Sequence, residues 1–207
     1  MFYSRMNQFI SQKVFVPVVL ICSLSSCDTN RISSVNRVAD MIEGTYDLTH
    51  ITWEGDALDL NGDGITSDEL YAELLSLPVN AENDHRAFVQ CISQDRTIGY
   101  VKMQLPMQNV NVTEDGRYPT VWMIGSRITI SLYYQIDPEG HLTIEQFDSI
   151  QINEDDARVE MLKMNNGTAW FNEKGQLFFK VTYTFYDYCK AQLVEGVIQY
   201  SFEKIDS

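Results

Sequence analysis

Three long runs of alternating apolar and polar residues constrain the fold of this chain most strongly. Residues 127–136, 176–188 and 193–205 each carry an apolar side chain at almost every second position. A period of two places successive side chains on opposite faces of a β-strand. Long strands with one apolar and one polar face are typical of an antiparallel sheet that buries a single face. The pattern therefore predicts an all-β domain.

Shorter segments rich in β-branched and aromatic residues predict further strands, and turn residues separate them. Asp137–Gly140 and Asn165–Gly167 predict tight turns, and a break in alternation near Phe147 predicts a bulge. About nine or ten strands with short connections favour an antiparallel up-and-down β-barrel, with a β-sandwich as the alternative. The additional expected strands are 44–53, 86–93, 97–105, 121–124, 141–152, 157–164 and 168–171.

One short helix is expected near the N-terminal end of the domain, over residues 67–77. Thr66 and Glu69 have the spacing of a capping box, which satisfies the first backbone N–H groups of a helix. The apolar side of this helix predicts packing against the core. It consists of Leu70, Leu74, Leu75 and Leu77.

The acidic run at 59–69 precedes that helix and has the D-x-N-x-D-G opening of a calcium-binding loop. Calcium prefers six to eight oxygen ligands, which residues at alternate positions supply. The twelfth position, where an EF-hand has glutamate, is Leu70, so the run resembles a shortened variant. The alternative is an acidic turn at a helix N-terminus, which the helix dipole also favours. The expected Ca²⁺ ligands are the side chains of Asp59, Asn61, Asp63, Asp68 and Glu69 and the carbonyl of Ile65.

The first residues have the organisation of a secretion signal. Arg5 and Lys13 precede a short apolar core at 14–21, which is too short to cross a bilayer. Leu24–Ser25–Ser26–Cys27 follows and resembles a bacterial lipobox. The resemblance implies a signal peptide at 1–26, lipidation of Cys27, a linker at 27–40 and a barrel domain at 41–207. An ordinary signal peptide with an incidental cysteine is the alternative.

Lipidation would place the protein in the cell envelope, held to a bacterial membrane by its acyl chains. We expect the outer membrane, facing the periplasm or the surface. Asp28 resembles an inner-membrane retention signal in enteric-type lipoproteins and a surface-export signal in other lineages, so the membrane stays open. The formal net charge of −14 argues against nucleic acid as a partner, because phosphate contacts need a basic surface.

Two further cysteines, Cys91 and Cys189, lie in the expected domain. In an oxidising compartment they could pair and close a long loop. Two separately placed thiols that behave as small apolar residues are the alternative.

Gly44–x–Tyr46 on the first strand, the antiparallel meander and an aromatic-rich last strand resemble the lipocalin-like lipoproteins of Gram-negative anaerobes. Lipocalins carry Gly-x-Trp at this place, with a basic residue from a late strand packed over it. This chain has Tyr46 at the tryptophan position, and Lys204 is the candidate basic residue. The resemblance implies a closed barrel whose interior holds a small apolar ligand.

The chain contains no nucleophile elbow, zinc-protease helix, P-loop or dinucleotide fingerprint. We therefore expect a non-enzymatic lipoprotein that binds a small apolar ligand or a protein partner. A structural or surface-interaction lipoprotein with a filled barrel is the alternative. Tyr133, Tyr186 and Tyr188 could line a ligand-binding face, although cross-strand packing is the commoner role of such residues.

Overall fold

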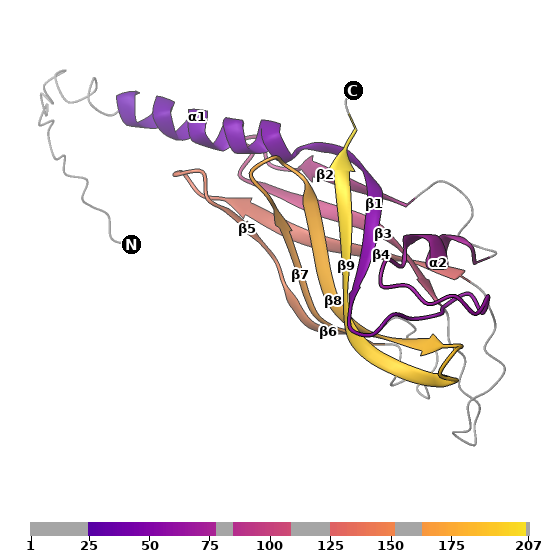
Figure 1. The fold of residues 1–207 in the computed structure, drawn as a ribbon. Helices are drawn as coiled ribbons and strands as arrows, with labels where there is room; N and C mark the ends of the chain where they lie inside the picture. Colours follow the sequence, from indigo (N-terminus) through magenta and orange to yellow (C-terminus); the bar gives the residue numbers. More distant parts are fainter. Residues whose placement is uncertain (1–24, 78–84, 109–124, 152–162, 206–207) are drawn as a thin grey trace, which may run out of the picture.

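The structure is a computed structural model that describes residues 25–77, 85–108, 125–151 and 163–205. Within these residues, nine strands form one antiparallel sheet accompanied by two helices (Figure 1). The strands are β1 Gly44–Glu54, β2 Arg86–Cys91, β3 Ile98–Gln108, β4 Gly125–Ile136, β5 Leu142–Ile144, β6 Phe147–Gln151, β7 Lys163–Phe171, β8 Leu177–Asp187 and β9 Gln192–Lys204; the helices are α1 Ser25–Ile42 and α2 Tyr71–Leu75.

The strands follow one another across the sheet in the order β5-β4-β3-β2-β1-β9-β8-β7-β6. Strands consecutive in the chain are therefore adjacent in the sheet, except β5 and β6, and β9 returns to pair with β1. This meander curls into a half-barrel, which confirms the expected all-β, barrel-like fold. The two edges of the sheet are β5 and β6, which are consecutive in the chain.

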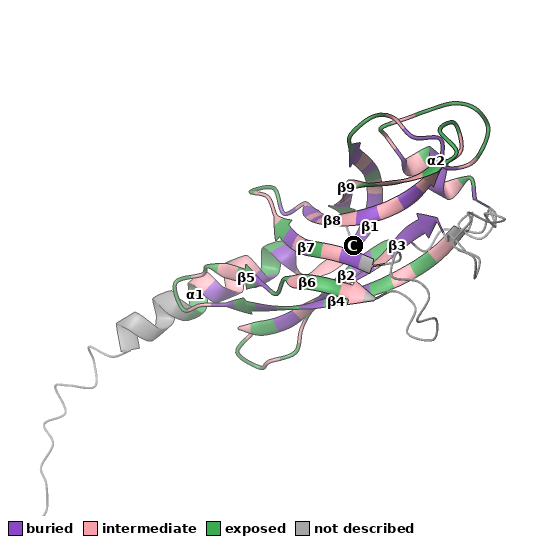
Figure 2. Cartoon of the chain, turned by 90° about the horizontal axis from the view of Figure 1, so that it is seen from below, coloured by how far each residue is buried: buried purple, intermediate pink, exposed green. Residues whose placement is uncertain are grey.

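The alternating pattern predicts which faces are buried. In β8 every second residue from Leu177 to Asp187 is buried, and the intervening residues are partly exposed (Figure 2). In β4 the buried face comprises Ile130, Leu132, Tyr134 and Ile136. Burial of one face follows directly from the period-2 sequence, because a slip of one residue would expose the whole apolar set.

Tyrosine side chains cross the inside of the curled sheet and bond to the opposite wall. The Tyr200 hydroxyl on β9 donates to the Pro106 carbonyl on β3 at 3.2 Å. The Tyr183 hydroxyl on β8 donates to the Gln108 carbonyl, also on β3, at 3.4 Å. Burial raises the pKa of both phenols, because the charged form would be desolvated. Large side chains thus occupy the interior between these strands.

The segment 27–40, expected as a linker from the anchor, lies in helix α1, and its C-terminal part packs against the sheet. The structural reason is an apolar stripe within a polar sequence. Val35, Ala39 and Ile42 recur at helical spacing and are buried against the core. The stripe is narrow, so the polar residues around it concealed the helix in the sequence.

The C-terminal end of α1 is fixed to the sheet by two cations. Arg96, in the turn between β2 and β3, contacts Asp40 and Glu43, each at 2.8 Å. The Lys204 ammonium on β9 donates to the carbonyls of Asp40 and Met41, both at 3.1 Å. Cations at a helix C-terminus complement its dipole and satisfy its last carbonyls.

Helix α2 is shorter than the expected 67–77, and the Thr66–Glu69 capping box does not form. Residues before the helix pair with β1 instead. Leu70 N–H donates to the Ile51 carbonyl at 2.6 Å, and Trp53 N–H donates to the Asp68 carbonyl at 2.8 Å. These backbone bonds hold the would-be first turn extended. The predicted apolar stripe is nevertheless buried, at Leu70, Leu74 and Leu77.

Asn165–Gly167 lies inside β7 and is a bulge, so the predicted hairpin turn is wrong. Asn166 has a φ of 56°, and the register with β8 shifts between Asn165 and Thr168. A Cβ on Gly167 would lie 2.1 Å from the Phe147 ring, so this position needs glycine. Asn-Gly favours left-handed backbone both in turns and in bulges, and the tertiary pairing decided between them.

Candidate functional site

The expected strand at 141–152 is divided into β5 and β6, and this division opens the barrel. β5 pairs with β4, whereas β6 pairs with β7. Glu145 and Gln146 separate the two strands, next to the bulge expected at Phe147. Pairing of β6 with β7 begins at Phe147 opposite Gly167, so residues 168–171 of β7 extend past β6 and face β5 without a shared ladder. We call this opening the seam.

A cavity of about 380 Å³, the seam pocket, lies at this opening. Its walls come from β5 and β7, and α1 contributes two further side chains. Most of the side chains are apolar, and three carry hydrogen-bonding groups: Thr143, Gln146 and the indole of Trp170. The pocket is lined by Val38, Met41, Gly140, Leu142, Thr143, Ile144, Gln146, Ala169, Trp170 and Phe171.

Two glycine turns allow α1 to approach the seam. Gly140, between β4 and β5, has a φ of 90°, and a Cβ there would lie 3.3 Å from the Ser34 Cβ. Gly175, between β7 and β8, has a φ of 75°, and a Cβ there would lie 3.3 Å from the Met41 carbonyl. Both positions therefore require left-handed backbone and a close approach. Helix α1 thus contacts the turns on both sides of the seam.

The barrel interior, where the lipocalin resemblance places a ligand, is filled by side chains between the described strands. Tyr46 and Phe171, from β1 and β7, have ring centroids 6.0 Å apart. Phe179 and Tyr200 are 6.2 Å apart and completely buried. The seam pocket therefore offers a ligand a place at the margin of this core. Lys204 does pack over Gly44: a Cβ there would lie 2.8 Å from Cε of Lys204.

The acidic loop is folded around its own backbone. Oδ1 of Asp59 accepts from Gly62 N–H at 2.7 Å, and Oδ2 accepts from Gly64 N–H at 3.0 Å. Asn61 Oδ1 accepts from Asp63 N–H at 2.9 Å. Three of the predicted ligand side chains, those of Asp59, Asn61 and Asp63, thus belong to one compact loop. Gly62 and Gly64 have φ values of 78° and 84°, which allow its sharp turns.

The predicted closing acids do not join this group. Asp68 is exposed, and Glu69 turns toward β1. Oε1 of Glu69 accepts from Ile51 N–H at 3.0 Å and from Tyr71 N–H at 3.3 Å. Ile65 is 66% exposed, and its N–H donates to Asp63 Oδ1 at 2.8 Å.

Glu73 on α2 is the acid that reaches the loop, and the sequence analysis missed it. Oε2 of Glu73 accepts from Leu60 N–H at 3.1 Å and Asn61 N–H at 3.3 Å, and the residue is 5% exposed. Burial raises the pKa of Glu73, the two backbone bonds oppose this shift, and the charges of Asp63 and Asp59 raise the pKa further. The sequence did indicate an unusual position for Glu73. It lies three residues after Leu70 and therefore falls on the apolar side of the helix.

Within the described ranges, no group of three or more His, Cys, Asp or Glu side chains is placed to hold a metal. The loop oxygens are the donor type that calcium prefers, but several of them already accept loop N–H groups. Side-chain oxygens that accept backbone N–H groups occur in compact turns as well as in metal-binding loops. Calcium binding at this loop therefore stays a prediction.

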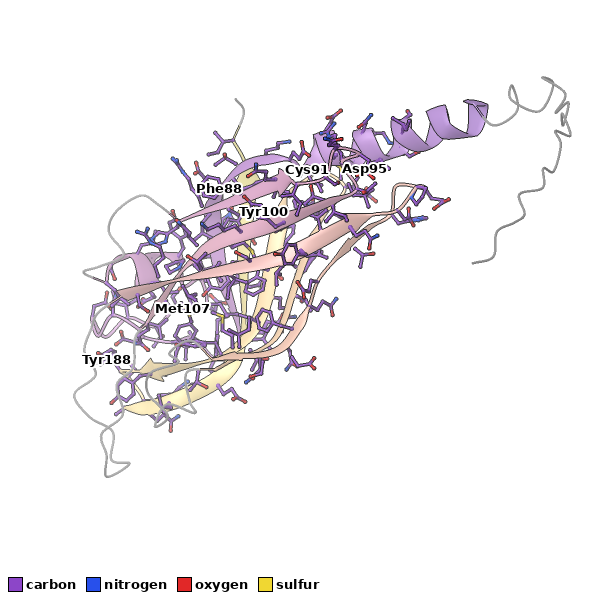
Figure 3. The ribbon with its side chains drawn as sticks, turned by 180° about the vertical axis from the view of Figure 1, so that it is seen from behind. Phe88, Cys91, Asp95, Tyr100, Met107 and Tyr188 are labelled. Carbon is purple, nitrogen blue, oxygen red and sulfur yellow. The ribbon has the colours of Figure 1, made fainter. Side chains whose placement is uncertain are left out.

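Cys91 and Cys189 are both free, so the disulfide considered above is not formed between these two described residues. Cys91 lies near the α1 end of the sheet, whereas Tyr188, the neighbour of Cys189, lies at the far end (Figure 3). Sγ of Cys91 donates to the Ser93 and Ile98 carbonyls, and Sγ of Cys189 contacts Asp59 Oδ2 at 3.5 Å. Cys189 is exposed, and local desolvation and the contact with Asp59 raise the pKa of its thiol, which disfavours a reactive thiolate.

The tyrosines predicted for a ligand-binding face are not brought together. Tyr133 is 61% exposed on the outer face of β4, opposite Tyr100 of β3. Phe88 and Tyr100 lie on β2 and β3 in the same region of the sheet (Figure 3). Tyr186 and Tyr188 form an edge-on pair with centroids 5.1 Å apart. The outer face of β2–β4 is thus a separate, partly apolar surface.

Comparison of the chain with protein-family models, with curated proteins and with solved structures finds no match. No helix in the described ranges is long and apolar enough to cross a membrane.

Proposed function

We propose that this protein is a non-enzymatic lipoprotein of the cell envelope that binds a small apolar ligand in the seam pocket. The observation that carries the proposal is the pocket itself: a cavity with apolar side chains and an almost equal share of polar surface, at the seam of the described sheet. Its volume lies within the range of small-molecule sites, which combine apolar walls with polar groups that orient the ligand.

The lipid anchor is part of the proposal and is supported by the N-terminal sequence. Cys27 ends a segment that resembles a lipobox, and it falls in the first two turns of α1. Acylation there would make α1 the connection between membrane and barrel. One continuous helix from Ser25 to Ile42 would then span from the anchor to the sheet.

A structural calcium ion in the 59–69 loop is a further element of the proposal. Its support is the alternation of Asp59, Asn61 and Asp63 in one compact loop, with Glu73 beside it. Calcium would offset the repulsion among these acids and fix α2 against the sheet.

Mass spectrometry of the protein purified from its own host tests the proposal. Under denaturing conditions we expect a covalent diacylglycerol adduct on the fragment that begins at Cys27. Under native conditions we expect an additional retained organic mass. An Ala169→Phe variant, which fills the seam pocket, should lose that mass, whereas Tyr133→Ala on the outer face should keep it. Retention by both variants would contradict the seam as the site.

A surface-interaction lipoprotein is the second candidate, favoured by the outer face of β2–β4. Exposed apolar residues on a sheet face commonly mark contact with a partner. Here they are Phe88, Ile98 and Tyr133 on the strands, which are 37%, 42% and 61% exposed, and Ile92 directly after β2, which is 56% exposed. Absence of a retained mass, together with self-association that Tyr133→Ala abolishes, would favour this candidate.

A further inference from the structure

We propose that the seam pocket selects an uncharged, single-chain amphiphile of medium chain length. The chain would lie inside the pocket, with a hydrogen-bonding head at the mouth. The inference rests on the proposed function, because it names the ligand class for the same pocket.

A gradient of polarity runs through the pocket. Ile144 and Ala169 are each 8% exposed and form the deep part. Trp170 is 37% exposed, and Thr143 and Gln146 are exposed, so these residues form the mouth. A ligand that fits this gradient has one apolar end and one hydrogen-bonding end. The edges of β5 and β7 that face each other add backbone groups without a shared ladder as further partners.

The charge of the pocket favours a neutral head. Among the described residues that line it, none has a charged side chain. In the sequence, Glu139 and Glu145 adjoin lining residues, and Arg37 on α1 precedes Val38. A carboxylate head at the mouth would find no cation in the lining, whereas a hydroxyl finds hydrogen-bonding partners in Thr143 and Gln146. The net charge of −14 further disfavours anions.

The dimensions favour a linear chain. Cα atoms of β5 and β7 approach within 8 Å of each other. A peptide strand inserted between them would need about twice the 4.8 Å strand spacing, so the opening is too narrow for one. The volume of about 380 Å³ is near the lower end of small-molecule sites, which favours a single chain over two.

Calorimetric titration of the detergent-free chain with straight-chain alcohols, from hexanol to tetradecanol, tests the inference. Each added methylene should tighten binding about fourfold until the pocket is full. We expect this increase to stop within the series, at the chain length that fills the pocket. Laurate should bind at least tenfold more weakly than dodecanol at pH 8. Affinity that rises steadily through tetradecanol, or laurate that equals dodecanol, would overturn the inference.

Matched variants connect the titration to the pocket. In Ala169→Phe the increase in affinity should stop at a shorter alcohol, because the ring occupies the deep end of the pocket. Ala72→Phe adds the same ring at an exposed alanine of α2, outside the pocket, and should leave the limiting chain length unchanged. Equal effects of the two variants would overturn the assignment. If no alcohol binds but a host-derived mass is still lost in Ala169→Phe, the inference fails while the proposed function stands.

Discussion

Glu73 is the residue whose position matters most for the acidic loop. It is a buried acid beside Asp59 and Asp63, and burial raises its pKa. The folded protein therefore holds the Glu73 proton more tightly than the unfolded chain does. The sign follows: this residue lowers stability as pH rises above about 4.3, its unfolded value.

Replacement of Glu73 by Gln should distinguish two roles of this residue: accepting the loop N–H groups and binding calcium. In chelator at pH 7, Glu73→Gln should raise Tm by about 2–4 °C, because glutamine keeps an acceptor for Leu60 N–H without the buried charge. With calcium, the original chain should gain stability and the variant should not. Thermal unfolding measures both effects, with the exposed Asp68→Asn as control. No calcium shift in the original chain would leave the loop as a turn.

Gly167 is fixed by a single neighbouring ring. A Cβ there would lie 2.1 Å from the Phe147 ring, so Gly167→Ala should lower the free energy of unfolding by about 1–3 kcal/mol. Chemical denaturation measures the change. The control is Asn166→Gly at the neighbouring position, which relieves a φ of 56° and should not destabilise the protein. A neutral Gly167→Ala would show that the bulge can shift.

At the scale of elements, Arg96 determines how α1 sits on the sheet. Its guanidinium bridges Asp40 and Glu43, and those hydrogen bonds raise the pKa of Arg96, so it stays charged. Oε1 of Glu43 is buried and has no hydrogen-bond partner in the described part of the chain. Loss of Arg96 would therefore leave a half-buried acid without its cation.

Arg96→Ala should loosen α1 without unfolding the sheet. We expect faster hydrogen exchange across residues 32–42 and weaker ligand retention, because Val38 and Met41 line the seam pocket. Arg86→Ala removes an exposed pair with Asp47 and should change stability by less than about 0.5 kcal/mol. Unchanged exchange in α1 would show that Lys204 and the apolar stripe suffice to hold the helix.

At the scale of the whole molecule, buried phenols make the fold sensitive to alkali. Burial raises the pKa of the phenols of Tyr46, Tyr134, Tyr183 and Tyr200 above the ordinary value. The unfolded chain releases these protons near pH 10, whereas the folded protein retains them. The contribution of the buried neutral phenols to stability is fully present below pH 10. It is lost as pH rises toward the pKa values of these phenols in the folded protein.

Alkaline titration should therefore show cooperative unfolding above about pH 10, with a loss of about 1.4 kcal/mol per pH unit for each buried phenol. Absorbance of tyrosinate and circular dichroism should change together. Tyr133→Phe, at an exposed residue, should not move the midpoint. Tyrosinate formation by the buried phenols before loss of structure would contradict this account.

The strand pattern was largely readable from the sequence, because burial of one face forces a period of two. β4, β8 and β9 bury the residues that the alternation selects. The seam was not readable in this way. Phe147 indicated an irregularity, but only pairing with distant strands determined that β5 joins β4 while β6 joins β7.

By itself, the sequence determined the all-β class, the buried faces and the glycines of the acidic loop, because these depend on local period and backbone freedom. The tertiary structure decided the rest: helix α1 where a linker was expected, a bulge at Asn165–Gly167, Glu73 beside the loop and a pocket at the seam. Each of these features depends on contacts between segments that are distant in the chain. The energies of such contacts exceed local conformational preferences, and they produce no repeating pattern in the local sequence.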